Sequence, residues 1–566
     1  MDEITLKRIE AYSENQLIEY FLDFNKKNAQ SVSIPEMELS HKKRLLSIFL
    51  QRMSQYPGTR VTCLESVRIL TRDKKDLDEL FNKEVVCMLI NWAGLAAREE
   101  EIAEKPQQVS DPKVSVEALK SLCNLIYNSA TAKKILCQQG CVEGLLLRLR
   151  MYSDPDMPYE VKFFDMRMLF LMTALCAEIR PRVRTELHGL IYLMEALDLI
   201  LKDNLAKSGP MAGRRTFNKG SRRGRSHQEA ETCLAACLTD EEVDMACEIL
   251  KILFNLTVRN ERFGLEEEEE AHYLRLASIL HDILLSDTKT PEKRDYLISH
   301  TVDLLTNMPV CSYEELMTPV VKMEEDRSYI YDGMDMEAIS VLIDFLEMRM
   351  NKPKIPIQEA ISPVLTALNE CARANSTIRK FLRKKILPPL KDVMKRPEQG
   401  SALRNRLVKL MTCPNYSVQM LVADLLFVLC KENVRRLIKY TGYGNAAGLL
   451  ANRGLLHGGN GRTDNYSSES EDTDTEEFLQ HRDNSINPMV GCYQEPQPSP
   501  FEGLTEEQKE FEAMQLVNML EKLTKEGVIQ PGCLGPDGKP QAVEHILQLR
   551  ESSTKPASEG KGKQEE

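Results

Sequence analysis

The sequence predicts an all-α protein: an armadillo or HEAT-like α-solenoid, followed by an acidic disordered linker and a C-terminal helix. Three observations support this prediction. Apolar residues recur at helical spacing from the N-terminus to about residue 455, alternating strand patterns are absent there, and distant segments share a repeat. Short breaks containing Pro, Gly or Asp separate the apolar segments, as at residues 56–58, 153–156 and 180–181. We therefore expect a solenoid over residues 1–455.

The repeat is clearest in two segments that share Glu, Leu, Lys, Leu, Asn and Leu in register. They are Glu117-Ala-Leu-Lys-Ser-Leu-Cys-Asn124-Leu and Glu248-Ile-Leu-Lys-Ile-Leu-Phe-Asn255-Leu. Their asparagines lie about three periods of roughly 43 residues apart, and this is the armadillo and HEAT period. Weaker versions of the repeat occur at residues 65–70, 363–369 and 418–429.

Composition narrows the class of function. The net charge of −12 argues against nucleic acid as a partner, because phosphate binding needs concentrated Lys and Arg. The 15 cysteines are scattered through a long chain, which indicates a reducing compartment. The first residues do not form a secretory signal, and the longest apolar stretch, Met168 to Ala177, is shorter than the roughly 20 residues of a membrane span. We expect a cytoplasmic protein without a transmembrane segment.

Two insertions interrupt the solenoid pattern. Residues 207–227 form a Gly- and Ser-rich loop that carries six basic residues between positions 214 and 225. The glutamates from Glu266 to Glu270 begin the next predicted helix. Their carboxylates are stabilised there by the partial positive charge of the helix N-terminus.

The C-terminal part divides into three segments. Residues 456–503 are acidic and rich in hydroxyl groups, so we expect them to be disordered. Residues 504–530 predict a helix that starts with a capping box from Thr505 to Gln508 and ends before Gly527. Its apolar stripe, which we expect to bind a partner, consists of Phe511, Met514, Val517, Leu520 and Leu523. Residues 531–566 are expected to be mostly disordered.

No pattern in the sequence indicates catalytic chemistry. The glycines from Gly442 to Gly448 superficially resemble a dinucleotide fingerprint, but residues 433–439 before them predict a helix instead of the required strand. Cys137/Cys141 and Cys233/Cys237 are each spaced to share one helical face, and no histidines cluster near them. We expect core thiols, no metal, no cofactor and no enzymatic activity.

Polar residues at repeating positions predict a binding groove instead. The last helix of each repeat lines the concave face of a solenoid, and Arg68, Arg72, Asn124 and Asn255 fall on such helices. A further basic cluster runs from Arg379 to Lys385 on a later repeat. These side chains are candidates for hydrogen bonds to an extended or helical ligand.

Several long, irregular segments resemble the synembryn family, also called resistance to inhibitors of cholinesterase. They include Phe163-Phe164-Asp165-Met-Arg167-Met-Leu-Phe170, Thr185-Glu-Leu-His188-Gly189, Ile386-Leu-Pro388-Pro389-Leu-Lys-Asp392-Val, and residues 439–456, 471–477 and 503–514. The resemblance covers essentially the whole chain. It implies a monomeric armadillo-like binder of heterotrimeric G-protein α subunits, GDP-bound or nascent, that acts as a non-receptor nucleotide exchange factor and folding chaperone.

The resemblance also implies roles for individual residues. The groove would hold the C-terminal helix of the α subunit through Arg68, Arg72, Asn124, Phe164, Arg379 and Lys380. The helix over residues 505–524 would support the opened GTPase core. Ser468 and Thr473 match sites of an acidophilic protein kinase, each with a glutamate three residues on. The family further implies recruitment from the cytoplasm to the cell cortex. The basic loop at 214–225 departs from the family pattern.

The alternative is a generic armadillo scaffold or adaptor protein, such as a nuclear import carrier. Import carriers line their groove with repeated Trp and Asn, whereas this chain has a single tryptophan, Trp92. That Trp ladder is therefore excluded.

Overall fold

The structure is a computed structural model that describes residues 3–31, 37–95, 111–208, 237–258, 266–320, 329–352, 355–459, 486–495, 503–530, 532–535 and 537–543. It divides into two compact units, unit 1 (Met1–Ile330) and unit 2 (Tyr331–Glu566). Both are built from helices, which confirms the predicted all-α solenoid class. In the described residues, no helix is both long enough and apolar enough to span a bilayer.

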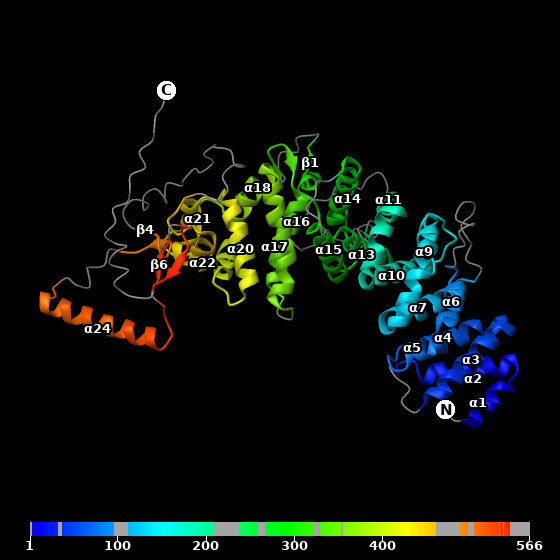
Figure 1. The fold of residues 1–566 in the computed structure, drawn as a ribbon. Helices are drawn as coiled ribbons and strands as arrows, with labels where there is room; N and C mark the ends of the chain where they lie inside the picture. Colours follow the sequence, from blue (N-terminus) through cyan, green and yellow to red (C-terminus); the bar gives the residue numbers. More distant parts are fainter. Residues whose placement is uncertain are drawn as a thin grey trace, which may run out of the picture. The chain divides into compact units, whose positions relative to one another are not determined.

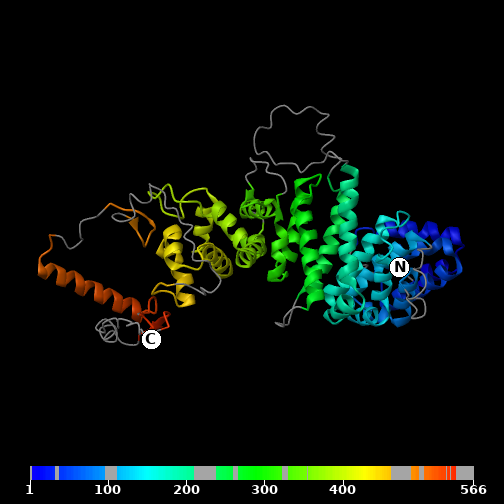
Figure 2. The ribbon, with the colours of Figure 1, turned by 90° about the horizontal axis from the view of Figure 1, so that it is seen from above.

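In its described residues, unit 1 is a succession of helices (Figures 1 and 2). Its helices are α1 (Glu3–Glu10), α2 (Glu14–Lys27), α3 (Leu39–Gln55), α4 (Arg60–Leu70), α5 (Leu77–Leu80), α6 (Lys83–Trp92), α7 (Pro112–Asn128), α8 (Ala130–Gln138), α9 (Cys141–Leu149), α10 (Tyr159–Leu175), α11 (Gly189–Ser208), α13 (Asp240–Thr257), α14 (Glu267–Leu285) and α15 (Pro291–Leu305). The described part of unit 1 also contains the short 3-10 helices η1 (Pro57–Thr59), η2 (Ala177–Ile179) and η4 (Val310–Leu316), the π-helical segment η3 (Arg182–Glu186) and strand β1 (Thr318–Pro319).

One helix from each repeat forms a continuous row in unit 1. In this row α2 packs on α4, α4 on α7, α7 on α10, α10 on α13 and α13 on α15. We call these the spine helices. In unit 2 the corresponding row is α17, α20 and α22. Every segment in which the sequence shows the repeat lies in a spine helix: α4, α7, α13, α17 or α20.

Capping residues explain where several helices begin. The Asp111 side chain accepts hydrogen bonds from the first backbone N–H groups of α7, and Pro112 occupies the first helical position, where no N–H is needed. A capping box between Thr239 and Glu242 starts α13. The acidic run opens α14 as expected, with Glu266 as its N-cap.

Unit 2 continues the helical pattern. Its helices are α16 (Glu337–Met350), α17 (Ile357–Ala374), α18 (Ser376–Ile386), α19 (Leu403–Leu410), α20 (Tyr416–Leu429), α21 (Val434–Thr441), α22 (Tyr443–Arg453) and α24 (Glu506–Lys525). Short strands are β2 (Ile330–Tyr331) at the boundary, β3 (Met334–Asp335), β4 (Ile486–Asn487), β5 (Cys492–Tyr493), β6 (Gly532–Leu534) and β7 (Pro540–Ala542). Gly442 separates α21 from α22 with a φ of +75°, so the glycine-rich segment is an inter-helix turn running into a helix.

Two short hairpins lie within segments where disorder was expected, residues 456–503 and the mostly disordered tail at 531–566. Strands β4 and β5 pair within the predicted linker, and β6 and β7 pair within the predicted tail. The first hairpin is ordered because it caps a helix: Pro488 and Met489 carbonyl oxygens accept the N–H groups of Tyr443 (2.8 Å) and Gly444 (2.9 Å) at the start of α22. The second hairpin approaches Gly454, the residue that ends α22.

A buried ion pair fixes α10 in unit 1. Arg148 of α9 and Asp165 of α10 are 3% and 0% exposed, and Arg148 Nε donates to Asp165 Oδ2 at 2.7 Å. Arg148 Nη1 also donates to the carbonyl oxygen of Ala93, at the end of α6, at 2.7 Å. Burial raises the pKa of the Asp165 carboxyl, while the charge of Arg148 opposes that rise. One arginine therefore holds three helices together.

Replacing Arg148 by Met is expected to lower the free energy of unfolding by about 3–5 kcal/mol, because the Asp165 carboxylate stays buried without a counter-charge. Urea or thermal unfolding followed by circular dichroism measures the change. The matched control is Arg275→Met, which removes a half-exposed arginine paired with Asp198 and should cost about 1 kcal/mol or less. Equal losses of unfolding free energy in the two variants would show that the buried ion pair stabilises the protein no more than the exposed pair does.

Candidate binding face on the spine helices

Two equivalent clusters of charged and aromatic side chains lie on the spine helices of unit 1. In the first, Glu117 of α7 is 7% exposed and accepts from Arg68 Nε of α4 at 2.8 Å and from Lys120 Nζ at 2.7 Å. Lys120 Nζ also lies 5.0 Å from the centre of the Phe164 ring of α10. The glutamate thus holds two cations in place beside an aromatic ring.

The second cluster, two spine helices further along, has the same pairing of a buried glutamate with an arginine and a lysine, and its aromatic ring comes from the preceding spine helix instead of the following one. Glu248 of α13 is 4% exposed and accepts from Arg167 Nη1 of α10 at 2.9 Å and from Lys251 Nζ at 2.6 Å. Lys251 Nζ lies 4.9 Å from the centre of the Phe170 ring. This correspondence gives a structural meaning to the Glu and Lys positions of the sequence repeat.

We call the eight residues of both clusters the ladder face: Arg68, Glu117, Lys120, Phe164, Arg167, Phe170, Glu248 and Lys251. Its carboxylates are buried, whereas the side chains of Arg68 and Arg167 are 28% and 42% exposed. The surface that a ligand meets is therefore cationic and aromatic. The cations are held in fixed positions, because each is already bonded to a buried glutamate.

The repeated asparagines tie neighbouring spine helices together. Asn124 Nδ2 of α7 donates to Thr71 Oγ1 at 3.1 Å and to the Arg68 carbonyl oxygen at 3.3 Å, both at the end of α4. Asn255 Nδ2 of α13 donates to Thr173 Oγ1 of α10 at 3.1 Å. The side-chain amide nitrogens of these asparagines thus bond between neighbouring spine helices, where they help to position the face.

Arg72 lies just beyond the C-terminal end of α4 and is half-buried. Its Nη1 donates to the carbonyl oxygens of Ala29 at 2.8 Å and Ser31 at 3.3 Å. Partial burial, and then the nearby charge of Arg68, lower the pKa of Arg72. A residue that the sequence did not single out, Tyr127 on α7, is 72% exposed and follows Asn124 by three positions, so it extends the spine surface with an aromatic ring.

The basic cluster of α18 belongs to unit 2 and is only partly exposed. Arg379 is 7% exposed, and its Nη1 donates to the Ala372 carbonyl oxygen at 2.8 Å, so it points into the repeat. Lys380 is half-buried. The exposed cations of α18 are Lys384 and Lys385, which were predicted only as members of the basic cluster from Arg379 to Lys385. Helical periodicity explains the difference, because position 379 lies on the apolar face of α18 with Ile378 and Leu382.

The C-terminal helix α24 begins and ends as the sequence predicts. Thr505 and Gln508 form the capping box, and Gly527 follows the helix with a φ of +70°. No residue of α24 is buried. Phe511, Met514, Val517 and Leu520 are all exposed, and Leu523 is half-buried. This apolar stripe is uncovered in the described part of the chain.

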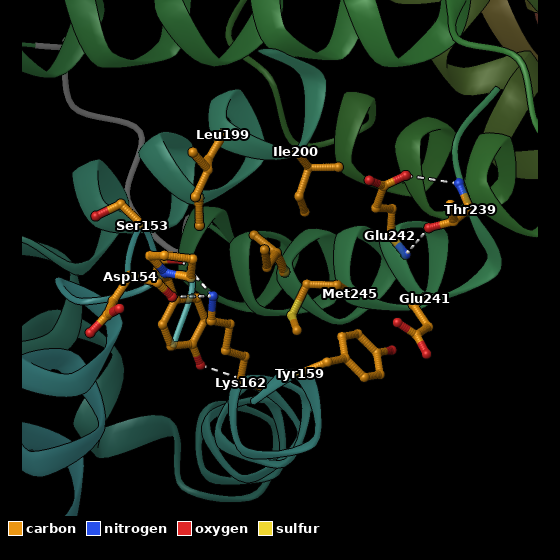
Figure 3. A pocket seen from close by; sticks show the side chains of 14 residues that line it. Ser153, Asp154, Tyr159, Lys162, Leu199, Ile200, Thr239, Glu241, Glu242 and Met245 are labelled. Carbon is orange, nitrogen blue, oxygen red and sulfur yellow. Dashed lines mark hydrogen bonds between the residues drawn. The ribbon is translucent and has the colours of Figure 1, made fainter. Parts of the chain in front are cut away.

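A cavity of about 610 Å³ lies between α10, α11 and α13 (Figure 3). Its apolar wall includes Leu199, Ile200 and Met245. Lys162 Nζ in the cavity donates to the carbonyl oxygens of Tyr152 at 2.7 Å and Asp154 at 3.1 Å. Thr239 and Glu242 on the other side form the α13 capping box. These polar groups hold the starts of α10 and α13 in place.

Some predicted sites lie outside the described residues. They are Ser468 and Thr473, the basic loop at positions 214–225, and Cys233.

Comparison with known proteins gives a consistent result. The family model described as "Ric8: Guanine nucleotide exchange factor synembryn" matches residues 63–539. "Chaperone Ric-8A" of Gallus gallus is 40% identical over 542 residues, covering 95% of each chain. The Xenopus tropicalis protein of that name is 41% identical over 555 residues, covering 97% of this chain and 98% of the relative. That of Danio rerio is 41% identical over 547 residues, covering 95% and 94%.

Proposed function

The chain belongs to the synembryn (Ric8) family, and on that premise we propose that it binds α subunits of heterotrimeric G proteins, GDP-bound or nascent, as a nucleotide exchange factor and folding chaperone. Both roles are supported by the comparisons, since the family is one of exchange factors and the relatives are chaperones.

Exchange of GDP for GTP needs no bond-making chemistry. It requires only a binder with higher affinity for the open, nucleotide-free state of the α subunit than for the closed state. We therefore propose that the chain is not an enzyme and uses no cofactor. A binder that holds a terminal helix away from the GTPase core would also shield that helix in a nascent subunit, so one surface serves both roles.

The ladder face is the observation that carries this proposal, as the binding site for the C-terminal helix of the α subunit. A helix C-terminus carries a partial negative charge and, at a chain end, a carboxylate. Arg68, Lys120 and Arg167 offer cations to that end, and Phe164 offers an aromatic surface to an apolar helix face. In this site Asn124 and Arg72 fix the geometry of the α4 and α7 ends.

Two features of unit 2 extend the proposed site. On α18, Lys380 supplies positive charge together with Lys384 and Lys385, while the buried Arg379 positions the helix. The uncovered stripe of α24 is proposed to pack on the opened GTPase core, because an apolar stripe of this kind gains stability only when a partner buries it.

Regulation forms a further part of the proposal. An acidophilic protein kinase would modify Ser468 and Thr473, and the added phosphates would bind a basic surface such as the 214–225 loop. We also propose a monomeric, cytoplasmic protein that is recruited to the cell cortex.

Arg72→Glu is expected to weaken complex formation with a GDP-loaded α subunit more than about tenfold and to slow the stimulated release of GDP, because a negative charge replaces a cation at the site. Release of a fluorescent GDP analogue and co-elution on a sizing column measure both effects. Arg8→Glu makes the same charge change on an exposed residue of α1 and should change neither. Thermal unfolding of both variants separates lost binding from lost folding. Full activity of Arg72→Glu would exclude this end of α4 from the site.

The double variant Val517→Glu/Leu520→Glu is expected to fold normally, because no residue of α24 is buried, yet to reduce stimulated GDP release about tenfold or more. Gln515→Glu/Lys522→Gln is the matched control, since it changes the net charge of the same helix by the same amount on the face opposite Val517 and Leu520. If the two double variants behave alike in the exchange assay, the stripe is not the contact.

Treatment with an acidophilic kinase is expected to strengthen binding of the α subunit by roughly tenfold, since each phosphate adds charge-assisted hydrogen bonds. Ser468→Ala/Thr473→Ala should remove this response and leave the untreated activity unchanged. Unchanged exchange and binding after stoichiometric phosphorylation would refute the proposed regulation.

A further inference from the structure

Three potential metal ligands converge where two helices of unit 1 end. The sulfur atoms of Cys137 and Cys176 and a carboxylate oxygen of Glu178 all lie within 4.8 Å of one another. Cys137 is in the last turn of α8, Cys176 is the C-cap residue of α10, and Glu178 lies in the following turn η2. Ligand atoms around one zinc ion lie roughly 4 Å apart or less, so only a small adjustment is needed to close the site.

The two sulfur atoms lie within 4.8 Å of each other, and solvent reaches the cluster from one side. Cys176 is buried, Cys137 is half-buried and Glu178 is exposed. An ion can therefore enter past Glu178 and meet the two sulfur atoms further in.

The position at two helix C-termini favours a cation. The C-terminal end of a helix carries a partial negative charge from its unpaired carbonyl groups, and both α8 and α10 end here. Reactive cysteines usually sit at helix N-termini, where the opposite partial charge stabilises a free thiolate. A bound metal ion, by contrast, gains from the field of both helix ends and supplies the charge that the two sulfur ligands need.

The spacing of the cysteines along the chain did not predict this cluster. Cys137 and Cys141 were expected to share one helical face, but this is wrong, because Gly140 adopts a φ of +68° and separates α8 from α9. Cys141 then begins α9 and is fully buried. Cys137 instead meets Cys176, which lies 39 positions later (176 − 137), too far along the chain for a short ligand motif.

We propose that Cys137, Cys176 and Glu178 bind one thiophilic divalent ion, with Zn²⁺ as the best match to two sulfur ligands and one carboxylate. The two thiols release their protons to solvent as the ion binds, so no oxidant or reductant is required. The fourth coordination position is left for water or for a donor atom from a partner. The ion would join α8 to the end of α10, the helix that carries Phe164 and Arg167 of the ladder face.

A cobalt titration of the full chain, reduced and stripped of metal with a chelator, tests the proposal. One equivalent of Co²⁺ is expected to produce sulfur-to-cobalt charge-transfer absorption, and Zn²⁺ should displace it. Cys137→Ser/Cys176→Ser should abolish that absorption, and Glu178→Gln should weaken binding about tenfold. Cys413→Ser, which removes a half-buried thiol of unit 2 outside the cluster, should change nothing. Zn²⁺ should also raise the unfolding temperature of wild type and not that of the double serine variant.

Three results would overturn the proposal. The first is the absence of a charge-transfer band from wild type at one equivalent of Co²⁺. The second is a band that persists in Cys137→Ser/Cys176→Ser, which would place the metal on other cysteines. The third is the loss of two thiols on mild oxidation of the stripped wild type, with neither Co²⁺ nor Zn²⁺ binding before oxidation, which would make the pair a redox dithiol instead.

Discussion

A carboxylate buried between helices must be neutralised, and in this protein that requirement determines how neighbouring helices face each other. Asp165, Glu117 and Glu248 are all nearly inaccessible, and each is bonded to an arginine of a neighbouring helix. Removing a counter-charge would leave an ion in a medium that solvates it poorly. In unit 2, Glu432 is 2% exposed and pairs with Arg373 of α17 at 2.8 Å, so the same constraint recurs there.

The proposed binding face is a consequence of this constraint. Because Glu117 and Glu248 need cations, Arg68, Lys120, Arg167 and Lys251 are held at the surface in an order set by the repeat. Cations that are already fixed lose little side-chain freedom when a ligand arrives, and this preorganisation favours binding. Interactions that stabilise the solenoid therefore also prepare its surface for a partner.

Sequence patterns predicted the features that depend on local periodicity and capping. These include the helical class, the spine segments, the α14 start and both ends of α24. They failed where contacts between distant segments decide the outcome. The β4–β5 hairpin bonds to the start of α22 and to Val393, Arg379 lies on the apolar face of α18, and Cys137 meets Cys176 instead of Cys141. Ser468 and Thr473 stay predictions.

The two hairpins also set how far α24 can travel. One contacts the start of α22 and the other approaches its end, where Gly442 meets Gly491 and Gly454 meets Gly538 too closely for any side chain. The segment carrying α24 is thus a loop anchored on both sides to a single helix. Such a loop keeps its apolar stripe at a high effective concentration near α22, because the stripe belongs to a segment tethered at both ends and not to a free tail.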